Sequence, residues 1–176
     1  MIKNIILAGG CFWCTEAIFR TIKGVKNIFP GYIGGHTKNP TYKDVCTGGT
    51  GHAEAISVDY DSKIISLENI LMIFFLTHDP TSLNRQGNDI GTQYRSSIFN
   101  DDENEIKIIL DYINDLEKSN KFENRIVTTI EKKDTFYIAE NYHHDYYSLN
   151  KNVPYCSAII SPKVKKLINS KSSLLK

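Results

Sequence analysis

The sequence predicts an α+β fold, a two-layer sandwich in which helices pack on one mixed or antiparallel sheet. Strand-like apolar runs and helical segments follow one another in the order β-α-β-β-α-β-α-β. The 41% hydrophobic and 23% charged content is that of an ordinary globular protein. The length of 176 residues suits one domain with a sizeable core. Because the order is close to a split β-α-β unit, we expect a ferredoxin-like core.

The first half of the chain has a local signal for each expected element. Gly24 ends the first helix, because glycine accepts the left-handed conformation of a helix C-terminus, and Ser66 is a suitable cap for the second helix. A polar, glycine-rich loop at 36–51 is long enough to carry function. In order, the elements are a strand at 2–8, a helix at 12–23, strands at 25–35 and 52–60, and a helix at 67–76.

The second half begins with another long polar loop, at 77–92, and becomes irregular from residue 134. We expect the aromatic-rich C-terminal tail to stay irregular and residues 170–176 to be frayed. The whole chain, 1–176, is predicted to form a single domain. The expected elements are a strand at 93–99, an amphipathic helix at 101–118, a strand at 126–130 and a short helix near 138–147.

Charge and cysteine content exclude several classes of function. Lys and Arg number 21 and Asp and Glu 20, so the net charge of +1 provides no field to attract nucleic acid or an anionic membrane. No apolar run reaches membrane-spanning length, and no signal-peptide pattern is present. Four cysteines without a secretion signal indicate a reducing compartment and redox or catalytic use. We therefore expect a cytoplasmic protein, and we expect it to be a monomer.

Cys11 is the most informative residue, because it follows an apolar run and the pair Gly9-Gly10 at the expected first turn of a helix. Unpaired backbone N–H groups and the helix dipole favour the reactive thiolate at such a position. Phe12 and Trp13 provide an apolar wall where a substrate would arrive. The glycine pair would let another molecule approach the backbone closely. The alternative is a small buried cysteine without reactivity, and the pattern favours the reactive interpretation.

Glu54 is the second candidate, because it lies on the more apolar face of its strand. Two-residue alternation places it on the same side as Ile56, Val58 and Tyr60. Desolvation there raises the pKa of a carboxyl, which can then act as a general acid near neutral pH. The alternative is a solvated carboxyl at the sheet's end or one paired with Arg95. Strand position alone leaves both open, and a reactive cysteine in the same chain favours acid catalysis.

Further motifs extend this pattern along essentially the whole chain, in one fixed order. Together they resemble the peptide methionine sulfoxide reductase A family. The motifs are Gly10-Cys11-Phe12-Trp13, Gly31-Tyr32-Ile33-Gly34-Gly35, Asn39-Pro40-Thr41-Tyr42, Val45-Cys46-Thr47-Gly48, Thr50-Gly51-His52-Ala53-Glu54, His78-Asp79-Pro80-Thr81, Asn84-Arg85-Gln86-Gly87-Asn88-Asp89, Gly91-Thr92-Gln93-Tyr94-Arg95-Ser96, Ala139-Glu140-Asn141-Tyr142-His143 and Tyr155-Cys156.

The resemblance implies an enzyme that reduces the S epimer of methionine sulfoxide, free or in proteins, without a cofactor. Such an enzyme repairs oxidised methionine after oxidative stress. A thiolate attacks the sulfur, an acid protonates the oxygen, and an apolar slot holds the methyl group. The implied roles are Cys11 as the nucleophile, Glu54 as the acid, Tyr42 and Tyr94 as hydrogen-bond donors to the oxygen, Phe12 and Trp13 around the methyl group, and Asp89 for orienting water and the substrate's backbone amide.

The attack would leave Cys11 as a sulfenic acid, which a second thiol must convert to a disulfide. Cys156 matches the family's usual resolving position, although the glycine that often precedes Tyr-Cys is missing here. Cys14 is the alternative, because a C-x-x-C pair can close a local disulfide. Cys46 is interpreted as structural. An external dithiol, thioredoxin, would then reduce the disulfide.

Two other classes of protein compete with this interpretation. A thioredoxin- or glutaredoxin-like oxidoreductase would use Cys11 and Cys14, but it leaves Glu54, Tyr42 and Asp89 without roles. A metal-binding module could draw on four Cys and five His, but zinc sites need paired clusters that are missing from this sequence. We therefore expect no metal. The adjacent pair His143 and His144 is interpreted as a surface or hydrogen-bonding pair.

Overall fold

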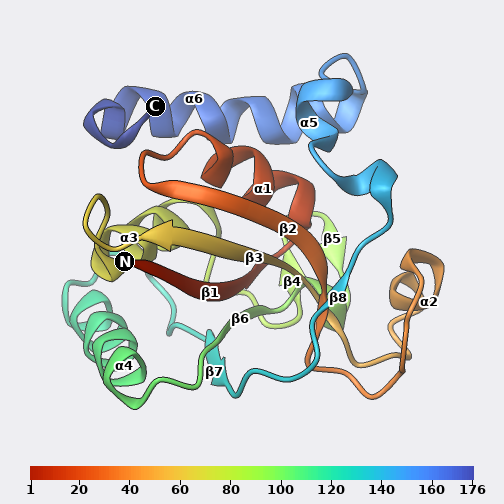
Figure 1. Cartoon of the computed structure of the whole chain (residues 1–176), viewed down its shortest axis with the longest axis horizontal. Helices are drawn as coiled ribbons and strands as arrows, with labels where there is room; N and C mark the ends of the chain where they lie inside the picture. Colours follow the sequence, from red (N-terminus) through yellow and green to blue (C-terminus); the bar gives the residue numbers. More distant parts are fainter.

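The computed structural model describes residues 1–176 and is built on one six-stranded sheet with the strand order β7-β6-β1-β3-β2-β8 (Figure 1). A separate two-stranded hairpin, β4 and β5, lies outside it. The strands are β1 Ile2–Gly9, β2 Val25–Ile33, β3 Ala53–Asp61, β4 Arg85–Gln86, β5 Asp89–Ile90, β6 Ser96–Phe99, β7 Thr129–Glu131 and β8 Tyr137–Ile138. The helices are α1 Phe12–Arg20, α2 Tyr42–Cys46, α3 Leu67–Thr77, α4 Glu103–Lys118, α5 Tyr146–Leu149 and α6 Ser161–Lys171.

The predicted α+β class is confirmed, and the central strands have the ferredoxin-like order β6-β1-β3-β2. Every pairing in the sheet is antiparallel except that of β6 with β7, so the sheet is mixed. Helices α1 and α3 are the two crossovers between these strands. This arrangement places the β1–α1 turn next to β3, which is where the candidate site forms. None of the helices is long and apolar enough to cross a bilayer.

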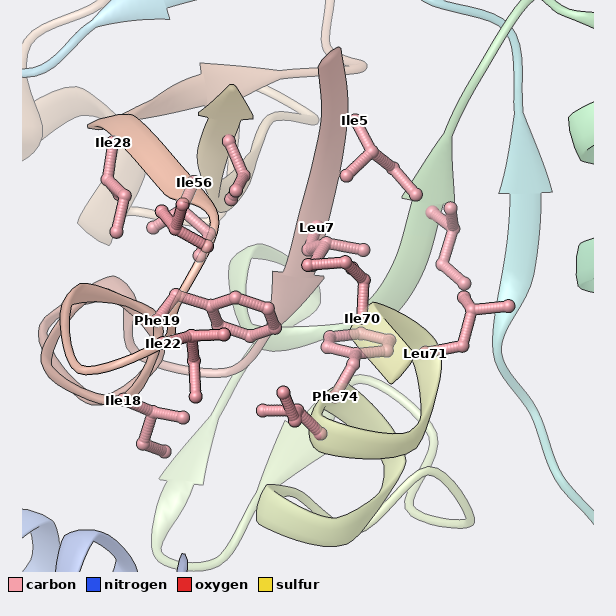
Figure 2. Packing of buried hydrophobic residues seen from close by; sticks show 14 of the residues in the cluster. Ile5, Leu7, Ile18, Phe19, Ile22, Ile28, Ile56, Ile70, Leu71 and Phe74 are labelled. Atoms are coloured by element: carbon pink, nitrogen blue, oxygen red, sulfur yellow. The ribbon is translucent and has the colours of Figure 1, made fainter. Parts of the chain in front are cut away.

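The main core lies between the sheet and helices α1 and α3 (Figure 2). Leu7 and Ile56 come from paired positions of β1 and β3 and point to the same face. Phe19 from α1 and Phe74 from α3 close over them, and all four side chains are fully buried. Each buried side chain of this size contributes about 1.5–3 kcal/mol, so this core holds β1 and α1, and the turn between them, in place.

Several sequence-predicted boundaries are wrong by a few residues. Helix α1 ends at Arg20, where the Thr21 N–H bonds back to Ile18, and not at residue 23. The strand predicted at 93–99 is a 3₁₀ turn over 92–94 followed by β6. Of the strand predicted at 126–130, only Thr129 and Ile130 belong to β7, which continues to Glu131. The long loop at 36–51 contains α2, which Thr41 begins with a capping box to Asp44.

The prediction of an irregular, frayed tail is also wrong. A π-helical segment, Cys156–Ile160, continues into α6, and both Ile160 and Leu167 are fully buried. The end of the chain is docked as well, because Leu175 forms an antiparallel bridge with Ile22 and the Lys176 N–H donates to the Thr21 carbonyl at 2.8 Å. Burial of one apolar face stabilises this segment, although its composition is largely polar.

Candidate active site

Cys11 is the N-cap residue of α1, directly after β1 and Gly10. Gly10 has φ +92°, and a Cβ there would meet the Gln86 side chain at 2.5 Å. A Cβ on Gly9 would meet Phe74 at 2.7 Å. Close contacts within this chain therefore require glycine at both positions. The pair fixes the direction in which the chain enters the helix.

The helix start favours the Cys11 thiolate, as expected, but it does not decide the protonation of this thiol. Cys11 is only 8% exposed. Burial raises the pKa of the Cys11 thiol well above its ordinary value, and neighbouring Cys14 and Glu54 raise it further. The Trp13 backbone N–H, at the start of α1, acts in the opposite direction and is outweighed. Desolvation of the charged form exceeds the benefit of the helix N-terminus, so Cys11 keeps its proton at neutral pH.

Glu54 lies on β3, and its side chain is 1% exposed. One of its oxygens, Oε2, accepts a hydrogen bond of 3.2 Å from the Phe12 N–H, the residue next to Cys11. Burial raises the pKa of Glu54 to about 8, against the smaller lowering effect of that N–H. Arg95 contacts Glu131 instead, so the alternatives of a solvated or Arg95-paired carboxyl do not hold. One hydrogen bond thus joins Glu54 to Phe12, the residue that follows Cys11.

Tyr42 and Tyr94 stand close to this carboxyl from two different segments. Tyr42 is the first residue of α2, and Tyr94 ends the 3₁₀ turn before β6. Burial raises the pKa of both phenols, and the nearby Glu54 raises both further. Both hydroxyls therefore remain protonated donors. The structure brings these two predicted residues together with Glu54.

Glu140 positions Tyr42, and sequence reasoning assigned it no role. Its Oε2 accepts from the Tyr42 backbone N–H at 3.0 Å, and its Oε1 accepts from the Tyr32 hydroxyl at 2.9 Å. Tyr32 is the residue opposite Glu54 in the β2–β3 pairing. The only signal in the sequence is the motif around residues 139–143, which does not by itself indicate this contact.

Phe12 and Trp13 differ in how they face the site. Phe12 is fully buried, and its ring lies 5.7 Å from that of Tyr32. Trp13 is half-buried, stacks on Tyr146 at 3.8 Å between ring centres, and donates from Nε1 to Nδ1 of His143 at 3.0 Å. His143 is fully buried, so it is a hydrogen-bonding residue and not a surface one. Of these two rings, that of Trp13 is the one that remains partly accessible.

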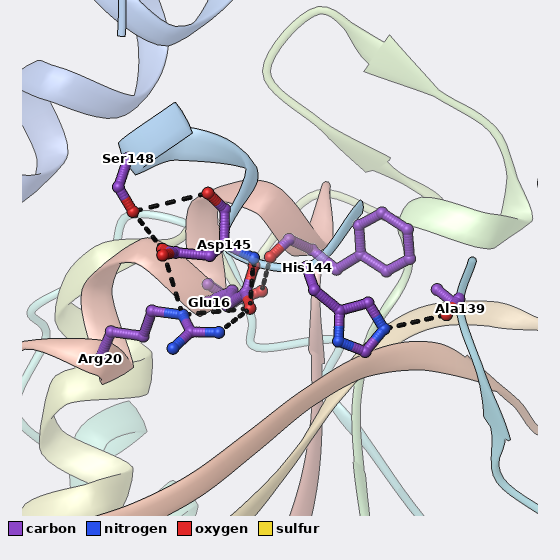
Figure 3. Close-up of polar contacts among 8 residues, drawn as sticks. Glu16, Arg20, Ala139, His144, Asp145 and Ser148 are labelled. Carbon is purple, nitrogen blue, oxygen red and sulfur yellow. Dashed lines mark hydrogen bonds and ion pairs between the residues drawn. The ribbon is translucent and has the colours of Figure 1, made fainter. Parts of the chain in front are cut away.

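A small polar network of Glu16, Arg20 and Asp145 joins α1 to the residue before Tyr146 (Figure 3). Both oxygens of the buried Glu16 accept from the Asp145 backbone N–H at 3.0 Å. Arg20 reaches Glu16 at 2.8 Å and Asp145 at 3.4 Å. This network fixes the start of α5 to α1, so the C-terminal segment covers the site at a defined position.

Asp89 lies at the start of β5 and accepts from the Tyr155 hydroxyl at 2.7 Å. The same hydroxyl is 3.8 Å from the Cys14 sulfur. These residues line a cavity of about 390 Å³ that contains Cys11 at its wall. Sequence reasoning recorded Tyr155 as part of a motif but gave it no role. The remaining lining comes from residues 86–88, Ala158, Ile159 and Lys163.

Two of the four cysteines, Cys11 and Cys14, line this cavity, and a third packs against them. Cys11, Cys14 and Cys156 belong to one buried cluster, whereas Cys46 is exposed and all four are free thiols. A hydrogen bond from Cys11 lowers the pKa of Cys14, with Lys163 acting in the same direction and burial opposing both. Burial raises the pKa of Cys156. No set of three His, Cys, Asp or Glu side chains is arranged to hold a metal ion.

A buried thiol, a carboxyl that keeps its proton near neutral pH and a second thiol with a lowered pKa define the site of a thiol-dependent oxidoreductase. Comparison with known proteins narrows this class. A family model described as peptide methionine sulfoxide reductase matches residues 3–175. The chain belongs to the peptide methionine sulfoxide reductase family, and it is an oxidoreductase that acts on methionine sulfoxide.

Individual relatives agree with this assignment. Peptide methionine sulfoxide reductase MsrA from Saccharolobus solfataricus is 54% identical over 162 residues, which cover 92% of this chain and 90% of that protein. Mxr1 from Saccharomyces cerevisiae in reduced form matches with a TM-score of 0.81 and 37% identity, over 88% of this chain and 89% of the other. Mxr1 in complex with Trx2 matches with a TM-score of 0.57 and 27% identity, over 82% and 84%. The resemblance stated from the sequence is therefore confirmed.

Proposed function

We propose that this chain reduces the S epimer of methionine sulfoxide, free and in proteins, with Cys11 as the nucleophile and Glu54 as the acid. One observation carries the proposal. A carboxyl with a pKa of about 8 is hydrogen-bonded to the residue that follows a buried cysteine. A protonated acid next to a thiol is what sulfoxide reduction needs, because the oxygen must gain a proton as sulfur is attacked.

The proton balance of the first step fits the raised pKa values of both groups. Glu54 donates its proton to the sulfoxide oxygen as the Cys11 sulfur attacks the substrate sulfur. The Cys11 thiol proton returns to the Glu54 carboxylate. The oxygen is transferred to Cys11, which is oxidised by two electrons to the sulfenic acid, and the sulfoxide is reduced to the sulfide. No net proton is taken up, so both groups can start protonated at neutral pH.

Substrate binding is assigned to the residues around this pair. Tyr42 and Tyr94 donate hydrogen bonds to the sulfoxide oxygen, which their protonated hydroxyls support. Trp13, with Phe12 behind it, encloses the methyl group. Asp89 orients water and the backbone amide of the substrate, and Tyr155 must release the Asp89 carboxylate for this contact to form.

We propose that Cys14 converts the Cys11 sulfenic acid to a disulfide, with Cys156 as the second candidate for this role. The lowered pKa of Cys14 gives it a larger thiolate fraction than Cys156, whose pKa is raised by burial. Its thiolate forms the disulfide with Cys11, and the hydroxide leaves as water after gaining one proton. Cys156 holds the position that the family usually uses and lies in the same cluster. A thioredoxin dithiol then reduces the disulfide by exchange, which the complex of Mxr1 with Trx2 supports. We further propose a cytoplasmic monomer that repairs oxidised proteins.

The proposed function is tested with separate S and R epimers of a methionine-sulfoxide peptide and dithiothreitol as reductant. Wild type is compared with Cys11→Ser and, as a matched control, with Cys46→Ser at the exposed cysteine. We expect turnover of the S epimer alone, lost in Cys11→Ser and unchanged in Cys46→Ser. Turnover of the R epimer, or full activity of Cys11→Ser, would contradict the proposal.

The resolving cysteine is identified from one turnover without reductant. In Cys14→Ser we expect the Cys11 sulfenic acid to accumulate and to be trapped by dimedone, as read by mass spectrometry. In Cys156→Ser we expect the Cys11–Cys14 disulfide to form as in wild type. Trapping in Cys156→Ser and disulfide formation in Cys14→Ser would assign the role to Cys156 instead.

A further inference from the structure

A second cavity, of about 460 Å³, lies next to the one that contains Cys11. It is bounded by residues 75–79 at the end of α3 and the loop after it, by residues 121–122 after α4, and by the start of α6. Gln86 and Lys163 line both cavities. The two cavities are therefore adjacent, and a chain bound at Cys11 can continue into the second one.

Positive charge dominates the second cavity. Lys121, Lys163 and Lys166 line it, and none of the three ammonium groups is within 4.0 Å of a carboxylate. Asp79 is the one acidic residue of the lining. Its oxygens already accept from Thr81 and from the Ser82 hydroxyl. The cavity thus carries three ammonium groups without an ion-pair partner and one carboxylate, which accepts hydrogen bonds from its own loop.

The remaining groups of the lining do not cancel this charge. His78 bonds to the Phe74 carbonyl and to Ser96, and burial lowers its pKa to about 4, so it is neutral at physiological pH. Phe75 and Phe122 provide apolar walls, against which the methylene groups of acidic side chains can pack. The chemistry that fits the cavity is therefore a peptide segment with carboxylate side chains.

We propose that this lysine-lined cavity binds Asp and Glu residues that flank the methionine sulfoxide, so that acidic segments of oxidised proteins are preferred substrates. The inference rests on the proposed function. The lysines are partly or fully exposed, so each ion pair adds a small increment, about two- to fivefold in affinity at low salt. The effect of Lys121 and Lys166 belongs to binding, because these two lysines line the second cavity and not the one that contains Cys11. We expect it in KM and not in kcat.

The test compares two peptides of equal length with a central (S)-methionine sulfoxide, one flanked by Asp and Glu and the other by Asn and Gln. Turnover is measured once with dithiothreitol and once with thioredoxin as the reductant. The double variant Lys121→Gln/Lys166→Gln removes charge from the second cavity and leaves Lys163, which also lines the Cys11 cavity, in place. The control is Lys107→Gln/Lys165→Gln, which removes the same charge from two exposed lysines outside both cavities.

Wild type should have a KM about tenfold lower for the acidic peptide at low salt, and the difference should shrink to about twofold near 0.5 M salt. The double variant should lose most of this preference with kcat unchanged, and the control should keep it. Equal KM values for the two peptides in wild type would overturn the proposal. So would an effect of the double variant on thioredoxin-supported turnover alone, which would assign the surface to the reductant. Failure to reduce either peptide would instead contradict the proposed function.

Discussion

The sheet region and the C-terminal segment, residues 141–176, contribute to the site in different ways. Cys11 and Glu54 are attached to β1 and β3, two central strands that are each paired on both sides. The C-terminal segment has no strand in the sheet and is held largely through side chains. Its contacts include a hydrogen bond from the Asp145 N–H to the Glu16 carboxylate and one from the Tyr155 hydroxyl to the Asp89 carboxylate. The reacting pair is therefore on the stiffer part of the molecule.

The two regions therefore have separate roles in the reaction. Transfer of oxygen needs a thiol and an acid at fixed positions, which a doubly paired sheet provides. Disulfide formation and its reduction need sulfur atoms to approach each other and become accessible. A segment held by one apolar face and a few hydrogen bonds can open at lower cost than a strand paired on both sides.

The largest expected effect is on activity after Glu54→Gln. The amide can still accept the Phe12 N–H but cannot give a proton, so kcat/KM for the S epimer should fall about 100- to 1000-fold. In wild type, kcat/KM should decline above pH about 8, where Glu54 loses its proton. The control is Glu105→Gln, a buried carboxyl bonded to Lys3 and Asn100. An active Glu54→Gln enzyme would remove the acid from the mechanism.

The second largest effect is on stability. Glu54→Gln lowers activity, but it should raise stability relative to wild type as the pH rises. Between pH about 4.5 and 8 the folded protein keeps the Glu54 proton that the unfolded chain releases. The free energy of unfolding of wild type therefore falls as pH rises across this window. The Glu54→Gln variant does not lose stability in this way. Its free energy of unfolding, relative to that of wild type, should therefore increase by about 3–5 kcal/mol from pH 4 to pH 9. Urea unfolding at both pH values measures it, and a pH-independent difference would contradict the buried carboxyl.

The smallest effect is expected in the C-terminal segment after Tyr155→Phe. Losing the hydrogen bond to Asp89 should cost about 1–2 kcal/mol locally. Amide hydrogen exchange at 153–160 should then speed up about 10-fold or more, with β1 and β3 unchanged. Tyr112→Phe is the matched control, because no hydrogen bond involves the hydroxyl of Tyr112, which packs against Phe75 from α4. Faster exchange throughout the sheet would show that the two regions do not open separately.

The sheet region could be predicted well from the sequence, because its signals are local. Two-residue alternation placed Glu54 on the buried face together with Ile56, Val58 and Tyr60, and the structure agrees. The direction of the Cys11 pKa could not be predicted in the same way. The helix start is visible in the sequence, but the burial that outweighs it comes partly from residues near 156–160, far along the chain.

The C-terminal segment shows why the rest was missed. Ile160, Val164 and Leu167 have helical spacing, yet they stand among serine and lysine residues, and the segment is stable only when packed on α1 and α3. The contact of Tyr155 with Asp89 joins residues 66 positions apart. No local pattern encodes such a pairing, so the position of this segment over the site had to come from the three-dimensional structure.

The central claim is that Glu54 holds a proton beside Cys11 at neutral pH, and infrared spectroscopy can test it directly. The carboxylic acid C=O stretch is compared between wild type and Glu54→Gln in the substrate-free protein as pH is raised. We predict a protonated-carboxyl band in wild type at pH 7, absent from the variant and lost with a midpoint near pH 8. A band that disappears below pH about 5, as for an ordinary glutamate, would contradict the account.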